Sequence, residues 1–189
     1  MRTLARYVLH ALFLCTLARA DDPTPAPPPT PVPAAAPAPP ARIGEPTVFS
    51  YQLPPGWVSF TVPHMYPIAV EKSGTAKAAQ AKAMISVTAK SANGDLINWC
   101  AQAMQQNKAQ FAALGAQVGQ LEPFLTATNA VGYRAPITLV SHGRALYYIM
   151  YFFDGGDGTK LTVTCACPAH DAARYIPLFE SAMKSFQPR

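Results

Sequence analysis

The stretch GYRAPITLVSHGRALYYIMYFF, residues 132–153, contains the pattern from which the fold of this chain can be predicted. Two apolar runs, 130–140 and 144–153, flank Ser141-His142-Gly143, a sequence typical of a tight turn between strands. The second run is apolar on both alternating faces, which is typical of a central strand covered on both sides. The stretch therefore predicts two consecutive strands in the middle of a sheet.

Further strands are expected on both sides of this pair. The glycine-rich sequence DGGDG (154–158) separates the pair from another strand at 159–166, and a strand at 117–125 precedes it. Three earlier segments also have the composition of strands, at 48–53, 57–62 and 82–90.

Two segments have helical spacing instead. After Asn93-Gly94-Asp95, apolar residues recur at intervals of three and four, and Gly115 is expected to end this helix. A second stripe closes the chain between 175 and 186, with Pro177 in its first turn or at a kink. This order of elements predicts an α+β fold. We expect its core to depend on six aromatic residues: Trp99, Phe111, Tyr148, Phe152, Phe179 and Phe186.

The first twenty residues are typical of a signal peptide. A basic start precedes an apolar run of 11 residues, 7–17, whereas a membrane-spanning helix needs about 20. The small residues around position 19 predict cleavage between Ala20 and Asp21, which leaves no transmembrane anchor and an exported, periplasmic or secreted protein. An alternative is a lipid anchor at Cys15, although the preceding Leu14 is bulkier than lipoprotein signals prefer.

Residues 21–46 form a low-complexity segment that contains PTPAPPPTPVPAAAPAPP. A segment of this composition buries too little apolar surface to fold, so we expect a disordered linker. It is either a passive spacer or a ligand for a proline-binding groove. Residues 47–189 then have the length of one compact domain.

The charge of the chain does not indicate nucleic-acid binding. The 15 Lys+Arg outnumber the 10 Asp+Glu, but Arg2, Arg6 and Arg19 leave with the signal peptide. The remaining basic residues are scattered, without the clusters that bind phosphates.

The stretch TVTCACPAH (162–170) is the strongest candidate for chemistry. Cys165 and Cys167 are two apart on a strand and therefore face the same side. With His170 they could hold a metal ion, or they could exchange disulfides with Cys100, although a closed zinc site needs a fourth ligand. We favour a structural role, in which Cys100 forms a disulfide with one member of the pair, because export favours oxidised thiols. Cys167 is the preferred partner, since it lies at the end of the strand where the backbone can adjust.

The remaining candidate groups favour turns and core packing over a site. His64 and His142 lie in predicted turns, and the DGGDG stretch lacks the ligand spacing of a calcium loop. Its glycines do not lie at the start of a helix, so they do not form a phosphate-binding loop. No Gly-x-Ser-x-Gly nucleophile motif occurs. No catalytic residue, cofactor or metal is therefore expected. The acids that could suggest a calcium site are Asp154, Asp157 and Asp171. The aromatic residues that could line a binding groove are Trp57, Tyr147, Tyr148 and Tyr151.

The order of elements resembles the PsbP-like fold, which PsbP photosystem subunits share with bacterial DcrB-like exported proteins. The resemblance covers 47–189. It is carried by LPPGW (53–57), the long helix, the 132–153 stretch and the ending TVTCACPAHDAARYIPLFESAMKSF (162–186). It implies an antiparallel sheet sandwiched by helices and a non-enzymatic binding or accessory protein with a protein or cell-envelope partner. The chain lacks a thylakoid-type transit peptide, so a photosystem role is not expected. The alternative is a small redox or metal protein centred on the three cysteines.

Overall fold

The computed structural model describes residues 42–43, 48–71 and 81–189. The predicted signal peptide, its cleavage site, Cys15 and all of the proline-rich segment except residues 42–43 lie outside the described residues. In the part of the chain that is described, no helix is both long and apolar enough to cross a membrane.

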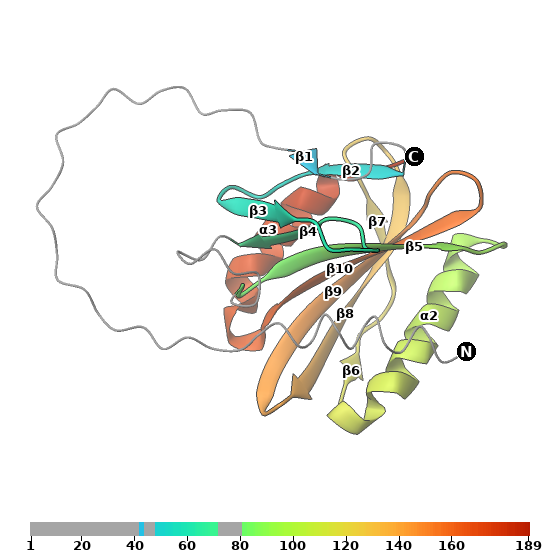
Figure 1. Cartoon of the computed structure of the whole chain (residues 1–189). Coiled ribbons are helices and arrows are strands. Elements are labelled where there is room, and N and C mark those ends of the chain that lie inside the picture. Colours follow the sequence, from blue (N-terminus) through green and yellow to red (C-terminus); the bar gives the residue numbers. More distant parts are fainter. Residues whose placement is uncertain (1–41, 44–47, 72–80) are drawn as a thin grey trace, which may run out of the picture.

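An antiparallel sheet of eight strands forms the centre of the domain (Figure 1). Its order is β3-β4-β5-β10-β9-β8-β6, and the short β7 also pairs with β8. Every pairing in it is antiparallel, as the resemblance implied. The strands are β3 (Trp57–Phe60), β4 (Ile68–Glu71), β5 (Met84–Ser91), β6 (Gln117–Val118), β7 (Glu122–Leu125), β8 (Val131–Ser141), β9 (Arg144–Asp154) and β10 (Thr159–Pro168).

The predicted pair of strands is present as the hairpin β8–β9. The turn residues His142 and Gly143 both have positive φ angles, 49° and 74°, as a tight hairpin turn requires. The DGGDG stretch likewise joins β9 to β10, with positive φ at Asp157 and Gly158. Both turn predictions are confirmed.

Helix α2 (Leu96–Phe111) begins where predicted, because Asp95 caps it. The Asp95 carboxylate accepts hydrogen bonds from the backbone N–H groups of Ile97 (2.7 Å) and Asn98 (3.2 Å). A 3-10 turn, η2 (Ala112–Leu114), follows, and Gly115 ends it in the left-handed conformation, with φ 63°.

Helix α3 (Ala172–Lys184) follows a 3-10 turn, η3 (Ala169–Asp171). Pro177 lies inside α3 rather than in its first turn, so the expected first-turn position is wrong. The helix tolerates the proline because buried side chains such as Tyr175 and Phe179 hold it against the sheet.

Strand β4 and the small second sheet were not predicted from the sequence. In that sheet β2 (Phe49–Gln52) pairs with β1 (Arg42–Ile43) on one side and with β11 (Gln187–Pro188) on the other. The backbone N–H of Arg189 also donates to the carbonyl of Val48 (2.9 Å). The start and the end of the domain therefore lie side by side, a pairing between distant residues that local patterns do not reveal.

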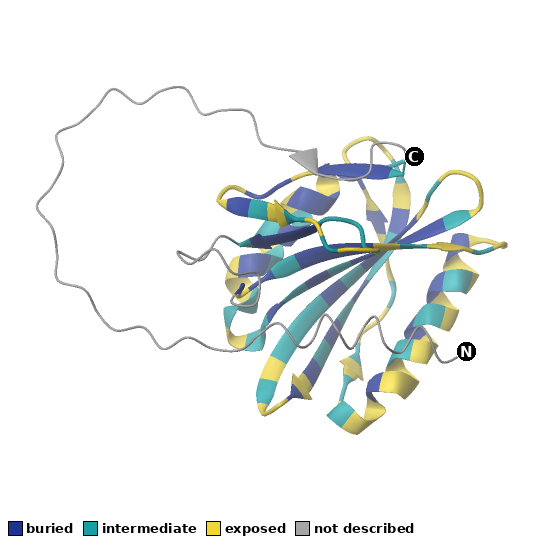
Figure 2. Cartoon of the chain, in the orientation of Figure 1, coloured by how far each residue is buried: buried dark blue, intermediate teal, exposed yellow. Residues whose placement is uncertain are grey.

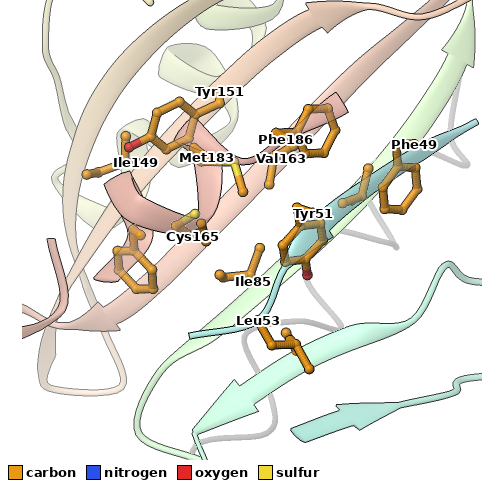
Figure 3. Packing of buried hydrophobic residues seen from close by; sticks show 14 of the residues in the cluster. Phe49, Tyr51, Leu53, Ile85, Ile149, Tyr151, Val163, Cys165, Met183 and Phe186 are labelled. Atoms are coloured by element: carbon orange, nitrogen blue, oxygen red, sulfur yellow. The ribbon is translucent and has the colours of Figure 1, made fainter. Parts of the chain in front are cut away.

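The two helices pack on opposite faces of the large sheet. Odd-numbered residues of β9 and β10 belong to the larger core cluster, together with α3; we call this side the α3 face. Even-numbered residues point to the other side, the α2 face, where Phe152 packs with Leu96, Cys100 and Met104 of α2. Figure 3 shows the α3-side core, where Tyr51, Tyr151, Cys165 and Phe186 lie among aliphatic side chains.

Four of the six predicted core aromatics are buried: Phe111, Phe152, Phe179 and Phe186. Trp99 and Tyr148 are only half-buried, since both lie at the margin of the α2-side cluster. Five further aromatic side chains, outside that set of six, have no exposed area: Phe49, Tyr51, Tyr151, Phe153 and Tyr175. Phe186 stacks on Phe153 and Phe49, with ring centroids 4.7 Å and 5.7 Å apart, which explains how β2 and the chain end join the core.

Candidate functional site: the cysteines and the half-covered sheet face

Cys165 and Cys167 lie on one face of β10, as predicted. They face α3, with 0% and 3% exposed area, and they pair across the sheet with Ile149 and Tyr147 of β9. Burial raises the pKa of Cys167 to about 12, and it raises the pKa of Cys165 well above the ordinary value. Both side chains are therefore protonated thiols that fill core volume, and neither is an exposed nucleophile.

Cys100 lies on the opposite side of the sheet. It is fully buried among α2-side residues, and burial raises the pKa of its thiol to about 12. All three cysteines are free in the structure. The predicted disulfide from Cys100 to Cys167 or Cys165 is therefore not formed, because α2 covers the face of the sheet away from both partners.

His170 does not join the cysteine pair. Its side chain is 80% exposed and lies 3.5 Å from the carboxylate of Asp171, while both sulfur atoms are buried under α3. Among the described residues, no group of three or more His, Cys, Asp or Glu side chains is placed to hold a metal ion.

The other candidates have structural surroundings. Trp57 is buried edge-on against Tyr175 and Phe179, with centroids 6.5 Å and 6.0 Å apart. Asp154 forms an ion pair with Lys160. The DGGDG turn holds the chain end, since the N–H of Gly156 donates to the carbonyl of Arg189.

The histidines and the aromatic groove candidates are also placed by the fold. His64 and His142 are exposed at positive φ, in turns as expected. Of the three tyrosines considered as groove residues, Tyr151 is buried, whereas Tyr147 and Tyr148 are half-buried on opposite faces of β9.

Two polar clusters fasten α3 to the sheet. The carboxylate of Glu71, at the end of β4, accepts hydrogen bonds from the guanidinium of Arg174 and the hydroxyl of Tyr175. Arg134 of β8 pairs with Glu122 of β7 (3.1 Å) and with Glu180 of α3. Both clusters join residues that are far apart in sequence, so sequence reasoning had no signal for them. Their bonds hold elements in place and do not converge on an open cavity.

The faces of the sheet differ in how completely they are covered. Along β10, Leu161, Val163 and Cys165 on the α3 face have no exposed area, whereas Thr162, Thr164 and Ala166 on the α2 face are half-buried. Helix α2 packs on β8, β9 and the short β6, and Figure 2 shows the intermediate exposure continuing across the neighbouring strands. The half-covered part of the α2 face is the candidate functional site. Its half-buried and exposed side chains are Met84, Thr88, Tyr148, Met150, Thr162, Thr164 and Ala166, and Ser86 between Met84 and Thr88 is buried.

This surface is uncharged at its centre. It combines threonine hydroxyl and methyl groups with one tyrosine and two methionines, and the Nδ2 group of Asn107 on α2 donates to the Met150 sulfur (3.4 Å). Charged side chains lie toward its two ends: Lys160 pairs with Asp154 at one end, and Arg144 begins β9 at the other. Such a surface suits contact with another polypeptide, since methionine and aromatic side chains adapt to apolar partners. Sequence reasoning interpreted β9 as covered on both faces and therefore missed this site.

The comparison with known proteins finds solved structures with a similar fold but no relative by sequence. No family model and no curated protein matches this sequence. Among solved structures, cyanobacterial PsbP (CyanoP) from Synechocystis sp. PCC 6803 superposes with a TM-score of 0.56 at 13% identity, over 79% of this chain and 92% of that one.

Two further structures have the same architecture. LpqN of Mycobacterium tuberculosis, a protein involved in cell envelope biogenesis, matches with a TM-score of 0.56 at 10% identity, over 79% of this chain and 85% of that one. The Ran-binding protein Mog1p of Saccharomyces cerevisiae matches with a TM-score of 0.54 at 11% identity, over 79% of this chain and 95% of that one. The described domain therefore has the PsbP-like fold, as its sequence pattern implied. Likeness at these identities establishes the fold alone.

Proposed function

We propose that this chain is an exported, non-catalytic accessory protein that binds a protein partner of the cell envelope through the half-covered α2 face. The main support for this proposal is the difference in burial between the two faces of β10. The side chains facing α3 are buried, while Thr162, Thr164 and Ala166 on the other face are only half-buried. A core needs both sides covered, so a face left half-covered suits contact with another molecule.

The comparisons support a binding role at the level of the fold. Mog1p is a Ran-binding protein, and LpqN is involved in cell envelope biogenesis. Export is supported by the signal-like residues 1–20, and the proline-rich segment 21–46 would then be a spacer between the domain and the rest of its surroundings.

The redox or metal alternative has no structural observation in its favour. Its three thiols lie on opposite faces of the sheet, with Cys100 separated from Cys165 and Cys167. Burial raises the pKa of each thiol, which keeps it protonated and unreactive.

Site-specific photo-crosslinking in the native envelope tests the proposal. The variant Thr164→p-benzoylphenylalanine places the crosslinker on the half-covered face, and Gln105→p-benzoylphenylalanine places it on the exposed side of α2 as a matched control. We expect a discrete crosslinked protein from position 164 and none from position 105. Equal crosslinking from both positions, or none from 164, would exclude this face as the binding surface.

A further inference from the structure

Strand β5 is longer than the strand beside it. On one side β10 pairs with β5 over its whole length, from Met84 to Ser91. On the other side β4 pairs only with Met84 and Ile85, and Figure 1 shows β5 extending beyond β3 and β4. Within the described ranges, residues 86–91 therefore have a strand partner on one side only.

The direction of the backbone groups follows from two hydrogen bonds. The carbonyl of Ala83 accepts from Glu71 N (3.3 Å) on the β4 side, and the N–H of Ala92 donates to Gly158 O (2.9 Å) on the β10 side. Since these directions alternate along a strand, odd-numbered residues of β5 present their N–H and C=O groups to the side away from β10.

Two residues thus form an open edge of β5: Ala89, which is half-buried, and Ser91, which is exposed. Val87 presents its backbone groups to the same side but is buried. Within the described part of the chain, no hydrogen bond or strand pairing uses their outward backbone groups. Unpaired donors and acceptors in this spacing are the template onto which an extended chain adds as a further strand.

The side chains along this edge indicate the chemistry of the added strand. Lys90 is exposed on the α2 face, and the register places it opposite Lys160, which in turn lies opposite Asp154. The Asp154 carboxylate pairs with Lys160, so the row across the sheet has one negative and two positive charges, and the outer one is Lys90. The next position in that row would lie on the added strand, where a carboxylate is favoured.

We propose that the open edge of β5 binds an extended segment of the partner protein as an added strand, with an acidic side chain beside Lys90. This inference rests on the proposed binding function and names the part of the partner that docks. A second copy of this chain fits less well, because it would bring another Lys90 to an edge that already has excess positive charge. The chain's own PTPAPPPTPVPAAAPAPP segment has no carboxylate, and its prolines have no N–H group to donate.

Amide hydrogen exchange of the isolated protein tests whether the edge is open. We expect fast exchange at Ala89 and Ser91, whose N–H groups point outward, and slower exchange at Thr88 and Lys90, whose N–H groups face β10. Equal protection of all four amides would show that another part of the chain already covers the edge, and it would overturn the proposal.

The binding step is tested by NMR titration with synthetic probes. The probe is the capped peptide Thr-Val-Glu-Val-Thr, and the control peptide carries Lys in place of Glu. We expect the Glu peptide to shift and protect the amides of Ala89 and Ser91 with a Kd of about 1 mM or tighter, and the Lys peptide to bind more weakly. No response at this edge at concentrations near that Kd would overturn the proposal.

Two pairs of variants separate backbone pairing from charge. Ala89→Pro removes an outward N–H group without removing a bond to β10, while Ala89→Ser retains it, so only the proline variant should lose binding. Lys90→Glu should weaken binding of the Glu peptide by up to about fivefold, whereas Lys108→Glu on α2 makes the same charge change and should not. Binding that survives Ala89→Pro would exclude strand addition.

The crosslinking experiment and the edge experiments distinguish failure of the proposed function from failure of the edge inference. If crosslinking at position 164 persists in Ala89→Pro, the α2 face binds the partner and the edge inference is wrong. If the partner is lost only in Ala89→Pro, the edge is required. If the free protein dimerises and Ala89→Pro makes it monomeric, a second copy occupies the edge, which contradicts the acidic-partner assignment.

Discussion

Within the described residues, the buried hydroxyl of Tyr51 has no hydrogen-bond partner, while the buried hydroxyl of Tyr151 lies beside Arg134. Both side chains have no exposed area, and burial raises the pKa of each, with Cys165 nearby as a smaller cause. Arg134 lies close enough to Tyr151 to lower its pKa in part, so Tyr51 is the clearer case. A buried hydroxyl without a partner destabilises a fold because its bonds to water are lost without replacement.

Removing the Tyr51 hydroxyl should therefore stabilise the protein. We expect Tyr51→Phe to raise the free energy of unfolding by about 1–2 kcal/mol. Tyr175→Phe is the matched control, because the equally buried hydroxyl of Tyr175 donates to Glu71, and its loss should lower the free energy of unfolding by about 1 kcal/mol. Urea titration measures both changes; a loss of stability in Tyr51→Phe would show that this hydroxyl is satisfied.

The cysteines predict a second residue-level result. All three are free and buried, and burial raises the pKa of Cys100 and Cys167 to about 12. Without reductant at pH 8, a thiol reagent should label none in the native protein and three in the denatured mature protein. A single labelled thiol in the denatured protein would instead show that Cys100 forms the disulfide expected from the sequence.

The same pKa shifts give a pH dependence. The native thiols stay protonated while unfolded thiols ionise near their ordinary pKa of about 8.5, so the unfolded state gains the ionisation that the native state lacks. The contribution to stability is therefore complete below that pH and decreases as pH rises toward 12. Urea midpoints at pH 8 and pH 10 should differ in this direction, and a Cys165→Ala variant should show a smaller difference.

At the scale of elements, α3 is held by a fully buried stripe. Phe179 has no exposed area and contacts Trp57 and Tyr175 through ring pairs. We expect Phe179→Ala to lower the free energy of unfolding by about 3–5 kcal/mol. Ser181→Ala, at an exposed position of the same helix, should change it by less than about 0.5 kcal/mol. Similar values for both variants in a denaturant titration would contradict the docking of α3.

Local pattern predicted most elements correctly, and its failures have physical reasons. The caps and turns at Asp95, Gly115, His142 and Gly143 were predictable because backbone conformation and side-chain chemistry at these positions are set by near neighbours. Strand β11 was missed because two residues carry no periodicity, and β4 was missed because its first three residues are all apolar and do not alternate. Their pairing partners, not their own residues, make them strands.

At the scale of the whole molecule, the chain end is part of the core. Phe186 is fully buried against Phe49, Tyr51 and Phe153, whereas 187–189 only add hydrogen bonds to β2 and its neighbours. Deleting 187–189 should therefore lower the melting temperature modestly. Deleting 186–189 should lower the free energy of unfolding by a further amount of about 3–5 kcal/mol. If the two deletion variants have the same melting temperature, Phe186 does not join the ends of the domain as described.

The sequence by itself determined the class of fold, the long hairpins, the two helices and the absence of a recognisable catalytic motif, because these depend on periodicity and turn chemistry within short windows. Only the tertiary structure decided which face each helix covers. That decision separates Cys100 from Cys165 and Cys167 and leaves the α2 face of β10 half-buried. The strand pairing, in turn, leaves residues 86–91 of β5 with a strand partner on one side only among the described residues. An apolar side chain has the same local pattern whether its face is fully or partly covered, since coverage depends on where a distant helix packs.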